Sequence, residues 1–178
     1  MDPPPYRRCQ GLFEFVAPAD RMIRQFKDSE DFVSGYTMAR LLAEQFVRHY
    51  QEAAHPLPSA LIPVPLSARR LRQRGFNQSA VLARTVGRYS GIAVPRDVCR
   101  RPRPGTDQRR LDRAARQRNM QDAFTASPHR RLTVPDHVAI IDDVVTTGAT
   151  ACSLARLLQG LGARIIDVWC LARVEPPD

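Results

Sequence analysis

The chain has 178 residues, 43% of them hydrophobic, which is enough for one domain with a substantial buried core. Its four cysteines are scattered and form no C-x-x-C pair, which argues against a zinc ribbon and against a disulfide framework. No apolar run approaches the length of about 18 residues that a membrane span needs, and the N-terminus lacks the apolar stretch of a signal peptide. These features predict a cytoplasmic protein with no membrane contact.

The formal net charge is +9, and Lys27 is the only lysine, so almost all of the positive charge comes from arginine. A basic chain attracts phosphates, either on nucleic acid or on a small ligand. Arginine also suits bidentate phosphate binding. A charge surplus can serve solubility alone, so composition by itself leaves these alternatives open.

The first third of the chain predicts one strand and two helices. Residues 9–16 show the partial apolar alternation of an edge strand, and a short helix follows Pro18. A longer helix covers about residues 32–53. Its predicted inner stripe consists of Met38, Leu41, Leu42, Gln45 and Phe46.

A short apolar strand and a basic segment come next. Residues 60–66 are apolar and cut by prolines, and residues 67–78 read SARRLRQRGFNQ. A basic loop at the end of a strand can hold a multiply charged anion, whereas the alternative is a solvated helical turn. The residue pattern does not separate the two. A helix over residues 79–89 and a short strand near Val98 complete this part.

A second basic stretch covers residues 100–118, RRPRPGTDQRRLDRAARQR. This composition is typical of a mobile loop that closes over an anionic ligand, of a nucleic-acid-binding segment, or of a solvated loop. Met120 and Phe124 then predict a return to packed structure, and residues 128–135 form a linker into the next strand.

The most informative stretch is residues 138–162, VAIIDDVVTTGATACSLARLLQGLG. Its apolar opening predicts a strand buried on both faces. Because an unpaired buried charge is costly, Asp142 and Asp143 should stand at the solvent-facing carboxyl end of this strand. Gly148 permits a positive φ and close approach of a ligand. A helix with its leucines on one face follows, and residues 165–171 complete a βαβ unit.

The order of residues in this unit indicates a chemistry. Free N–H groups and the dipole at a helix N-terminus favour a phosphate. Two carboxylates beside it suit ribose hydroxyls or a hard divalent cation. A phosphate and a ribose at this spacing indicate a sugar phosphate. The alternative is an ordinary βαβ unit with a Thr/Gly turn, which leaves the order of acids, hydroxyls and glycine unexplained.

The stretch resembles the phosphoribosyl-pyrophosphate (PRPP) signature of type I phosphoribosyltransferases, which has an apolar run, two acids and a T-G-x-T phosphate loop. Two further blocks narrow the resemblance. Residues 63–78 contain PVPL followed by RxxxRGFNQ, and residues 108–124 form a middle block with arginines ahead of an asparagine. All three blocks are similar, in this order, to those of the competence protein ComF family, and the similarity covers nearly the whole chain.

The resemblance implies an α/β fold of the type I phosphoribosyltransferase kind, with a mostly parallel twisted sheet flanked by helices. Residues 1–57 would form a small hood-like segment packed on a core of residues 58–178. The implied activity is transfer of ribose 5-phosphate from PRPP to a nitrogen acceptor with release of pyrophosphate, linked to competence and DNA uptake. The alternative is a module that senses PRPP or a nucleoside monophosphate with little catalysis.

The resemblance also implies roles for individual residues. Asp142 and Asp143, as the catalytic pair, would hold the ribose hydroxyls directly or through Mg²⁺. Arg70 and Arg74 would face the pyrophosphate. The cover loop would contain Gln108 and Arg109. The 5′-phosphate loop would consist of Thr146, Thr147, Gly148, Ala149 and Thr150.

Three departures from the family pattern qualify these roles. Many members begin with a cysteine-rich zinc ribbon that this sequence lacks, which indicates a short form or a missing upstream piece. Ser67 stands where members often have histidine. Thr146 stands where some purine-salvage relatives carry an acidic general base, which disfavours purine salvage. Single-stranded DNA, recombination or competence proteins and a second copy of the chain stay open as partners.

Overall fold

The computed structural model describes residues 3–28, 32–101, 123–127 and 134–174. Within them the elements are, in chain order, β1 (Arg8–Glu14), α1 (Ala19–Asp28), α2 (Phe32–Glu52), β2 (Ala60–Pro63), α3 (Ala68–Arg74), α4 (Gln78–Ser90), β3 (Cys99–Arg100), β4 (Thr125–Ala126), β5 (His137–Val145), α6 (Ala149–Gly160) and β6 (Ile165–Arg173).

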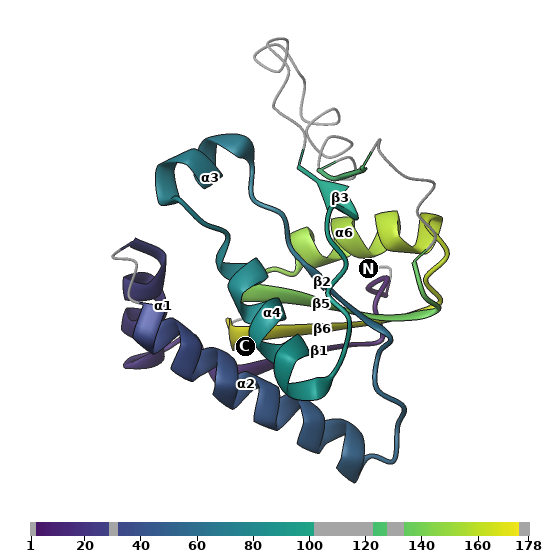
Figure 1. Cartoon of the computed structure of the whole chain (residues 1–178), viewed down its shortest axis with the longest axis horizontal. Helices are drawn as coiled ribbons and strands as arrows, with labels where there is room; N and C mark the ends of the chain where they lie inside the picture. The colour runs from purple at the N-terminus through teal and green to yellow at the C-terminus, as the bar shows by residue number, and fades with distance from the viewer. Residues whose placement is uncertain (1–2, 29–31, 102–122, 128–133, 175–178) are drawn as a thin grey trace.

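A parallel sheet forms the centre of the fold, with strand order β1-β6-β5-β2 (Figure 1). β5 pairs with β6 from His137–Ile165 to Val145–Arg173, and β2 pairs with the first half of β5. β1 pairs in parallel with β6 at the far edge. Parallel neighbours need a crossover connection, and α6 supplies it between β5 and β6. β3 and β4 form a separate antiparallel pair.

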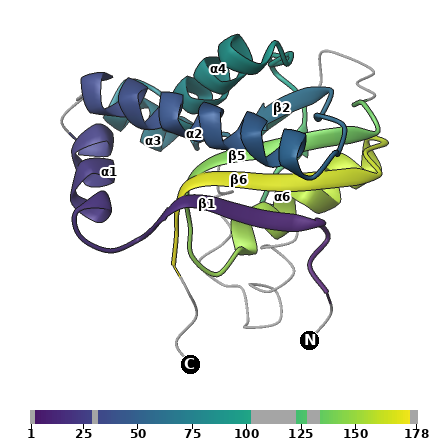
Figure 2. The same cartoon turned by 90° about the horizontal axis from the view of Figure 1, so that it is seen from below.

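Helices cover both faces of the sheet, as Figure 2 shows from below. Successive side chains of a strand point to opposite faces, so β5 contributes to two cores. Ala139 and Ile141 pack with α1, α2 and α4, whereas Val138 and Ile140 pack with α6. Burial on both faces explains why the strand reads as an unbroken apolar run in the sequence.

The predicted fold class is confirmed: the chain is an α/β protein whose parallel sheet is flanked by helices, consistent with a type I phosphoribosyltransferase-like fold. The predicted edge strand is β1, and the predicted βαβ unit is β5, α6 and β6. The division into residues 1–57 and 58–178 stays a prediction, although β1 belongs to the same sheet as the later strands.

The predicted inner stripe of α2 is correct except at one position. Met38, Leu42 and Phe46 are buried, but Leu41 is 43% exposed. The buried face of α2 also includes Ala39 and Ala43, and Leu41 lies about 100° from Leu42 on the side away from these alanines, so it is turned out of the core.

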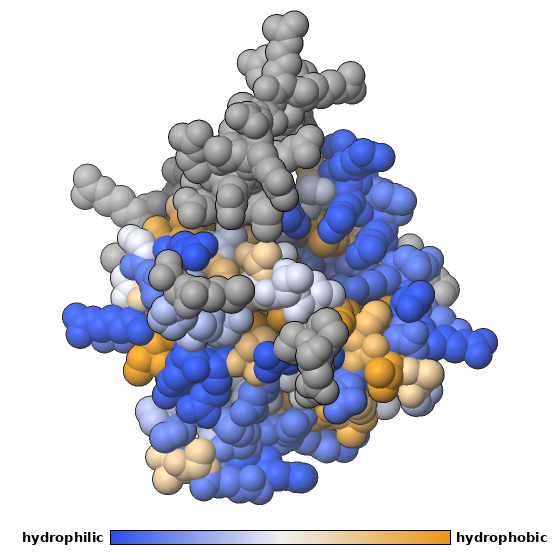
Figure 3. Space-filling model, turned by 180° about the vertical axis from the view of Figure 1, so that it is seen from behind, coloured by the Kyte–Doolittle hydropathy of each residue, from blue (hydrophilic) through white to orange (hydrophobic). Residues whose placement is uncertain are grey.

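The surface seen from behind is predominantly hydrophilic, and its apolar areas are small and separate (Figure 3). In the described part of the chain, no helix combines the length and apolar character needed to cross a membrane. The cytoplasmic location stays a prediction.

Candidate functional site

A pocket of about 400 Å³ lies where β2 and β5 end and α4 begins. It brings the predicted acids together with the predicted arginines. Its charged and hydroxyl-bearing lining consists of Lys27, Arg70, Arg74, Ser79, Arg101, Asp142, Asp143, Thr146 and Thr150. The carboxyl edge of a parallel sheet is the usual place for ligands in open α/β folds.

The RGFNQ block shapes one wall of this pocket. Gly75 ends α3 with φ 77°, a conformation that glycine adopts without strain. The ring of Phe76 packs 5.6 Å from that of Phe26 and so anchors the block against α1. The side-chain amide of Asn77 donates to the carbonyl of Val64 at 3.0 Å, which ties RGFNQ to PVPL. The two blocks are therefore one structural unit.

The arginines of this wall lie on α3, a helix with no buried residue. Ser67 is its N-cap, and the Ser67 hydroxyl accepts from the backbone N–H of Arg70 at 3.3 Å. The segment is therefore a solvated helix, and it still directs Arg70 and Arg74 into the pocket lining. The helical alternative for residues 67–78 is therefore confirmed, and binding of an anion by this segment stays a prediction.

Asp142 differs from the sequence expectation. It lies inside β5, not beyond it, and is only 7% exposed, so it is not solvent-facing. The hydroxyl of Ser79 donates to Asp142 Oδ1 at 3.1 Å, and the backbone N–H of Asp143 donates to the same oxygen at 2.9 Å. Burial, and secondarily the negative charge of Asp143, raise the pKa of Asp142 to about 7. This carboxyl can therefore hold or release a proton near neutral pH.

Asp143 is half-buried and forms an ion pair with Lys27, whose Nζ lies 3.0 Å from Oδ1. Lys27 belongs to the last turn of α1, so the N-terminal segment contributes a cation directly to the acid pair. The sequence showed Lys27 as the sole lysine but contained no sign of this contact.

The predicted phosphate loop joins β5 to α6. Gly148 is the N-cap of α6 with φ 74°, as predicted, and a side chain there would meet the Tyr6 hydroxyl at 2.9 Å. Thr146 and Thr147 are exposed, and a hollow of about 30 Å³ is bounded by residues 144–151 together with Asp142. The N-terminus of α6 thus opens beside the acids, which suits an anion.

Arg101 is a further basic residue of the pocket, and sequence reasoning placed it only in the basic stretch of residues 100–118, without a role in a site. Its guanidinium lies 5.4 Å from the centre of the Phe124 ring. Burial, together with the positive charge of Arg70, lowers the pKa of Arg101. Two cations that face one pocket repel each other, and an anion between them would relieve this repulsion.

Gln108 and Arg109 lie outside the described residues. Among those that are described, no group of three or more His, Cys, Asp or Glu side chains could hold a metal ion.

This geometry defines a class: an α/β protein with a pocket of paired acids, arginines and a Gly-containing loop at the carboxyl edge of a parallel sheet.

No protein-family model matches the chain. It is 34% identical over 174 residues to the DNA utilization protein YhgH of Salmonella typhi, covering 96% of this chain and 74% of that protein. It is 33% identical over 170 residues to competence protein F of Haemophilus influenzae, with the same coverage.

A third relative is competence protein ComFC of Streptococcus pneumoniae, which is 25% identical over 169 residues, or 92% of this chain and 67% of the relative. The identity to the first two relatives and the long alignments establish that the chain belongs to the ComF family of competence and DNA utilization proteins. The predicted family is therefore confirmed.

Proposed function

We propose that the pocket binds PRPP together with Mg²⁺ and that the chain transfers ribose 5-phosphate to a nitrogen acceptor with release of pyrophosphate. The observation that carries this proposal is the pocket itself. It joins Asp142 and Asp143 to the phosphate-loop threonines and to the arginines of α3, which are far apart in the sequence. Each part matches one part of PRPP: paired acids for the ribose, a helix N-terminus for the 5-phosphate, and arginines for the pyrophosphate.

The roles follow from the contacts. Residues 146–150 present backbone N–H groups and hydroxyls to the 5-phosphate. Asp142 and Asp143 accept hydrogen bonds from the ribose hydroxyls. Arg70, Arg74 and Arg101 bind the pyrophosphate, because one guanidinium group can donate two parallel hydrogen bonds to phosphate oxygens.

The side chains present fit Mg²⁺. This ion prefers oxygen donors, retains several waters, and binds through one or two carboxylates plus substrate phosphates. Asp142 and Asp143 are the two carboxylates of the pocket, and a set of three or more protein ligands is not required. When bound, Mg²⁺ would neutralise charge on the pyrophosphate.

The chemistry is displacement at C1 of the ribose. The C1–O bond to pyrophosphate breaks, a bond from the acceptor nitrogen forms, and the pyrophosphate leaves with the bonding electrons. Negative charge grows on the leaving group, and the three arginines are placed to stabilise it.

A sensing role is the second candidate, in which PRPP or a nucleotide binds without turnover. It is favoured by Thr146, because this exposed hydroxyl stands where some purine-salvage relatives carry an acidic general base. The relatives are named for DNA utilization and competence. We propose that this chain acts in the same process, with single-stranded DNA or competence proteins as partners.

The binding proposal is tested by titration calorimetry with PRPP, with and without Mg²⁺. The double variant Asp142→Asn and Asp143→Asn should bind PRPP at least about tenfold more weakly, because hydrogen bonds to two charged groups are lost. The matched control is Asp136→Asn, since Asp136 has a side chain that is 71% exposed and lies at the opposite end of β5. Equal affinity of the double variant and the control would refute the proposal.

Turnover separates the two candidates. Pyrophosphate release from PRPP is followed with a panel of nitrogen bases. Steady release with one base supports transfer, whereas binding without release across the panel supports sensing.

A further inference from the structure

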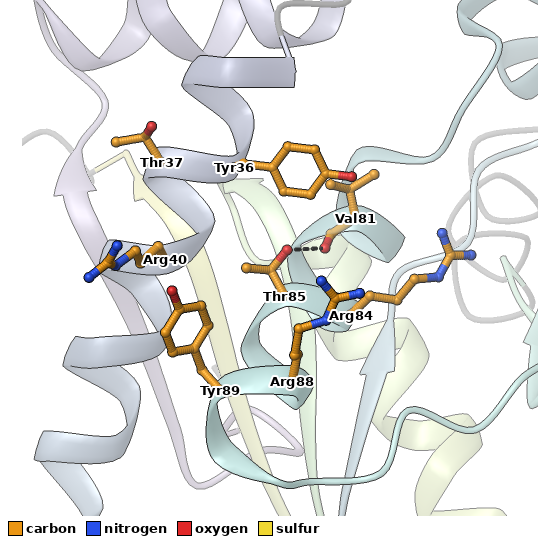
Figure 4. A pocket seen from close by; sticks show the side chains of 8 residues that line it. All are labelled: Tyr36, Thr37, Arg40, Val81, Arg84, Thr85, Arg88 and Tyr89. Atoms are coloured by element: carbon orange, nitrogen blue, oxygen red, sulfur yellow. Dashed lines mark hydrogen bonds between the residues drawn. The ribbon is translucent and has the colours of Figure 1, made fainter.

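A second hollow of about 530 Å³ lies between α2 and α4, away from the pocket described above (Figure 4). Each helix contributes side chains with helical spacing, so each presents one continuous face. Tyr36, Thr37 and Arg40 come from α2. Val81, Arg84, Thr85, Arg88 and Tyr89 come from α4. We call this surface the α2–α4 groove.

Two aromatic rings in this groove stay accessible. Tyr36 is 54% exposed and Tyr89 is 51% exposed. Figure 4 shows that they extend from opposite walls, Tyr36 from α2 toward Val81 and Tyr89 from α4 toward Arg40. Exposed aromatic faces are the surfaces on which the bases of single-stranded nucleic acids stack.

The groove is also strongly basic. Three of its eight lining residues are arginines, and none is acidic. Arg40 lies 5.8 Å from the centre of the Tyr89 ring and forms an ion pair with Glu44 on the neighbouring turn. Arg84 and Arg88 are exposed, and no carboxylate among the described residues forms an ion pair with either. Two guanidinium groups are therefore available for phosphates beside the rings.

A second hollow adjoins the α2–α4 groove. Arg84 also lines this adjoining hollow of about 800 Å³, whose other charged residues are Arg96 and Asp97. In Figure 4 the Arg84 guanidinium extends away from the tyrosines. A ligand that follows these arginines would span more than one nucleotide, and its bases must be unpaired from any partner strand to stack on the rings.

From the exposed rings, the unpaired arginines and this continuation, we propose that the α2–α4 groove binds a single strand of nucleic acid. Bases stack on Tyr36 and Tyr89, and phosphates pair with Arg84 and Arg88. The proposal rests on the role in DNA utilization proposed above and gives its single-stranded DNA partner a surface, but it is independent of PRPP binding because this surface is a different one. An apolar partner helix fits less well, since Val81 is the only aliphatic residue in the lining.

The test uses fluorescence anisotropy with a labelled oligothymidylate of about 15 nucleotides, which is within the site sizes of single-strand binders. Tyr36→Ala with Tyr89→Ala should weaken binding at least about 30-fold, because stacking of two bases is lost. Tyr36→Phe with Tyr89→Phe keeps both rings and should stay within about twofold of the wild type. Equal losses for the alanine and phenylalanine pairs would overturn the stacking assignment.

The charge contribution is tested in the same assay. Arg84→Gln with Arg88→Gln should reduce the slope of log affinity against log salt by about 1.4, corresponding to two phosphate contacts on a single strand. The matched control is Arg156→Gln with Arg164→Gln, which removes the same charge from exposed positions in and just after α6. An equal reduction in the control would show a general charge effect and refute the groove.

Competition identifies the ligand class. Unlabelled oligothymidylate should displace the probe, whereas thymidine monophosphate and duplex DNA should do so only at far higher concentration. Displacement by the monophosphate at similar concentrations would contradict a strand-binding groove. PRPP titrations on the groove variants should give wild-type affinity, which separates failure here from failure of the proposed function. Unchanged denaturant unfolding curves confirm that each variant is folded.

Discussion

Asp142 has a pKa of about 7, so its protonation changes near neutral pH. It is buried, and it lies next to Asp143, so two negative charges share one end of β5. Lys27 balances the charge of Asp143 directly at 3.0 Å, while Asp142 receives only the hydrogen bonds from the Ser79 hydroxyl and a backbone N–H. The two carboxyls therefore have unequal environments.

This difference predicts a pH dependence of stability. The folded-state pKa of Asp142 is about 7, above the usual value of about 4 that it has when unfolded. The folded state therefore binds the proton more tightly, so the stabilisation is full below pH 4 and is lost as the pH rises through 7. Between these values the free energy of unfolding should fall by up to about 1.4 kcal/mol per pH unit.

The measurement is urea unfolding of the wild type and of Asp142→Asn between pH 4 and 8. The variant has no proton to release at this position, so its stability curve should be flatter over this range, and Asp136→Asn should follow the wild type. Parallel curves for wild type and Asp142→Asn would show that the carboxyl titrates normally.

At this scale the sequence predicted which residues line the candidate pocket better than it predicted their surroundings. The two acids, the phosphate loop, and the pair of Arg70 and Arg74 each belong to one short sequence motif. The residues of a short motif lie close together in the sequence, so the motif can be recognised without the fold. The residues that surround them in the pocket come from distant segments of the chain. Lys27 belongs to α1, and Arg101 directly follows β3. No periodicity or spacing connects such positions, so their contacts emerge only from the folded chain.

Among the elements, α1 and α2 form the unit that carries Lys27 to the site. Gly35 of α2 is buried against the ring of Phe26 in α1, and a Cβ at position 35 would lie 2.3 Å from two ring carbons. Phe26 also packs against Phe76 of the RGFNQ block. Close approach of the two helices therefore depends on the absence of a side chain at position 35.

Gly35→Ala should destabilise the protein by up to about 2 kcal/mol. Alanine improves helix propensity by roughly 1 kcal/mol, but overpacking a rigid core costs about 1–3 kcal/mol. The control is Gly160→Ala at the end of α6, where nothing lies within 4 Å of the added methyl group. This substitution should leave stability unchanged or raise it by up to about 1 kcal/mol. Denaturant unfolding compares the two, and equal signs would contradict the packing argument.

The helices and strands were more predictable from the sequence than the contacts between them. Helical periodicity and capping residues predicted α2, α4 and α6 to within a few residues, because each signal is local. The boundary of β5 was less predictable, since Asp142 and Asp143 resemble the polar end of a strand although β5 pairs with β6 as far as Val145. The role of Gly35 in α2 could not be recognised from the sequence, because it depends on contact with the Phe26 ring of α1.

For the whole molecule, a buried polar cluster joins the beginning and end of the chain. Asp167 of β6 is fully buried and accepts hydrogen bonds from Arg7, 160 residues away, at 2.9 and 2.6 Å. The Tyr50 hydroxyl of α2 donates to it at 2.5 Å, and His137 Nε2 of β5 lies 2.9 Å away. In the sequence, Asp167 is a single acid within an apolar run, without any indication of these partners.

The pKa of Asp167 reflects this cluster. Burial acts to raise the pKa, but hydrogen bonds from Arg7, Tyr50 and His137 outweigh it, so the pKa lies below its usual value. The ionised carboxylate therefore stabilises the fold above the unfolded-state pKa of about 4, and this contribution is lost as the pH falls through the lower folded-state pKa.

Asp167→Ala should reduce the free energy of unfolding by about 3–5 kcal/mol, because a buried charge network loses its only common acceptor. Tyr50→Phe removes a single hydrogen bond to a charged group and should cost about 1.5–3 kcal/mol, which keeps the test measurable if the first variant does not fold. Asp136→Ala, at an exposed position, should change stability by less than about 0.5 kcal/mol. Urea unfolding at pH 7 ranks the three variants. If Asp167→Ala and Tyr50→Phe both cost no more than Asp136→Ala, the cluster contributes nothing to the stability of the fold.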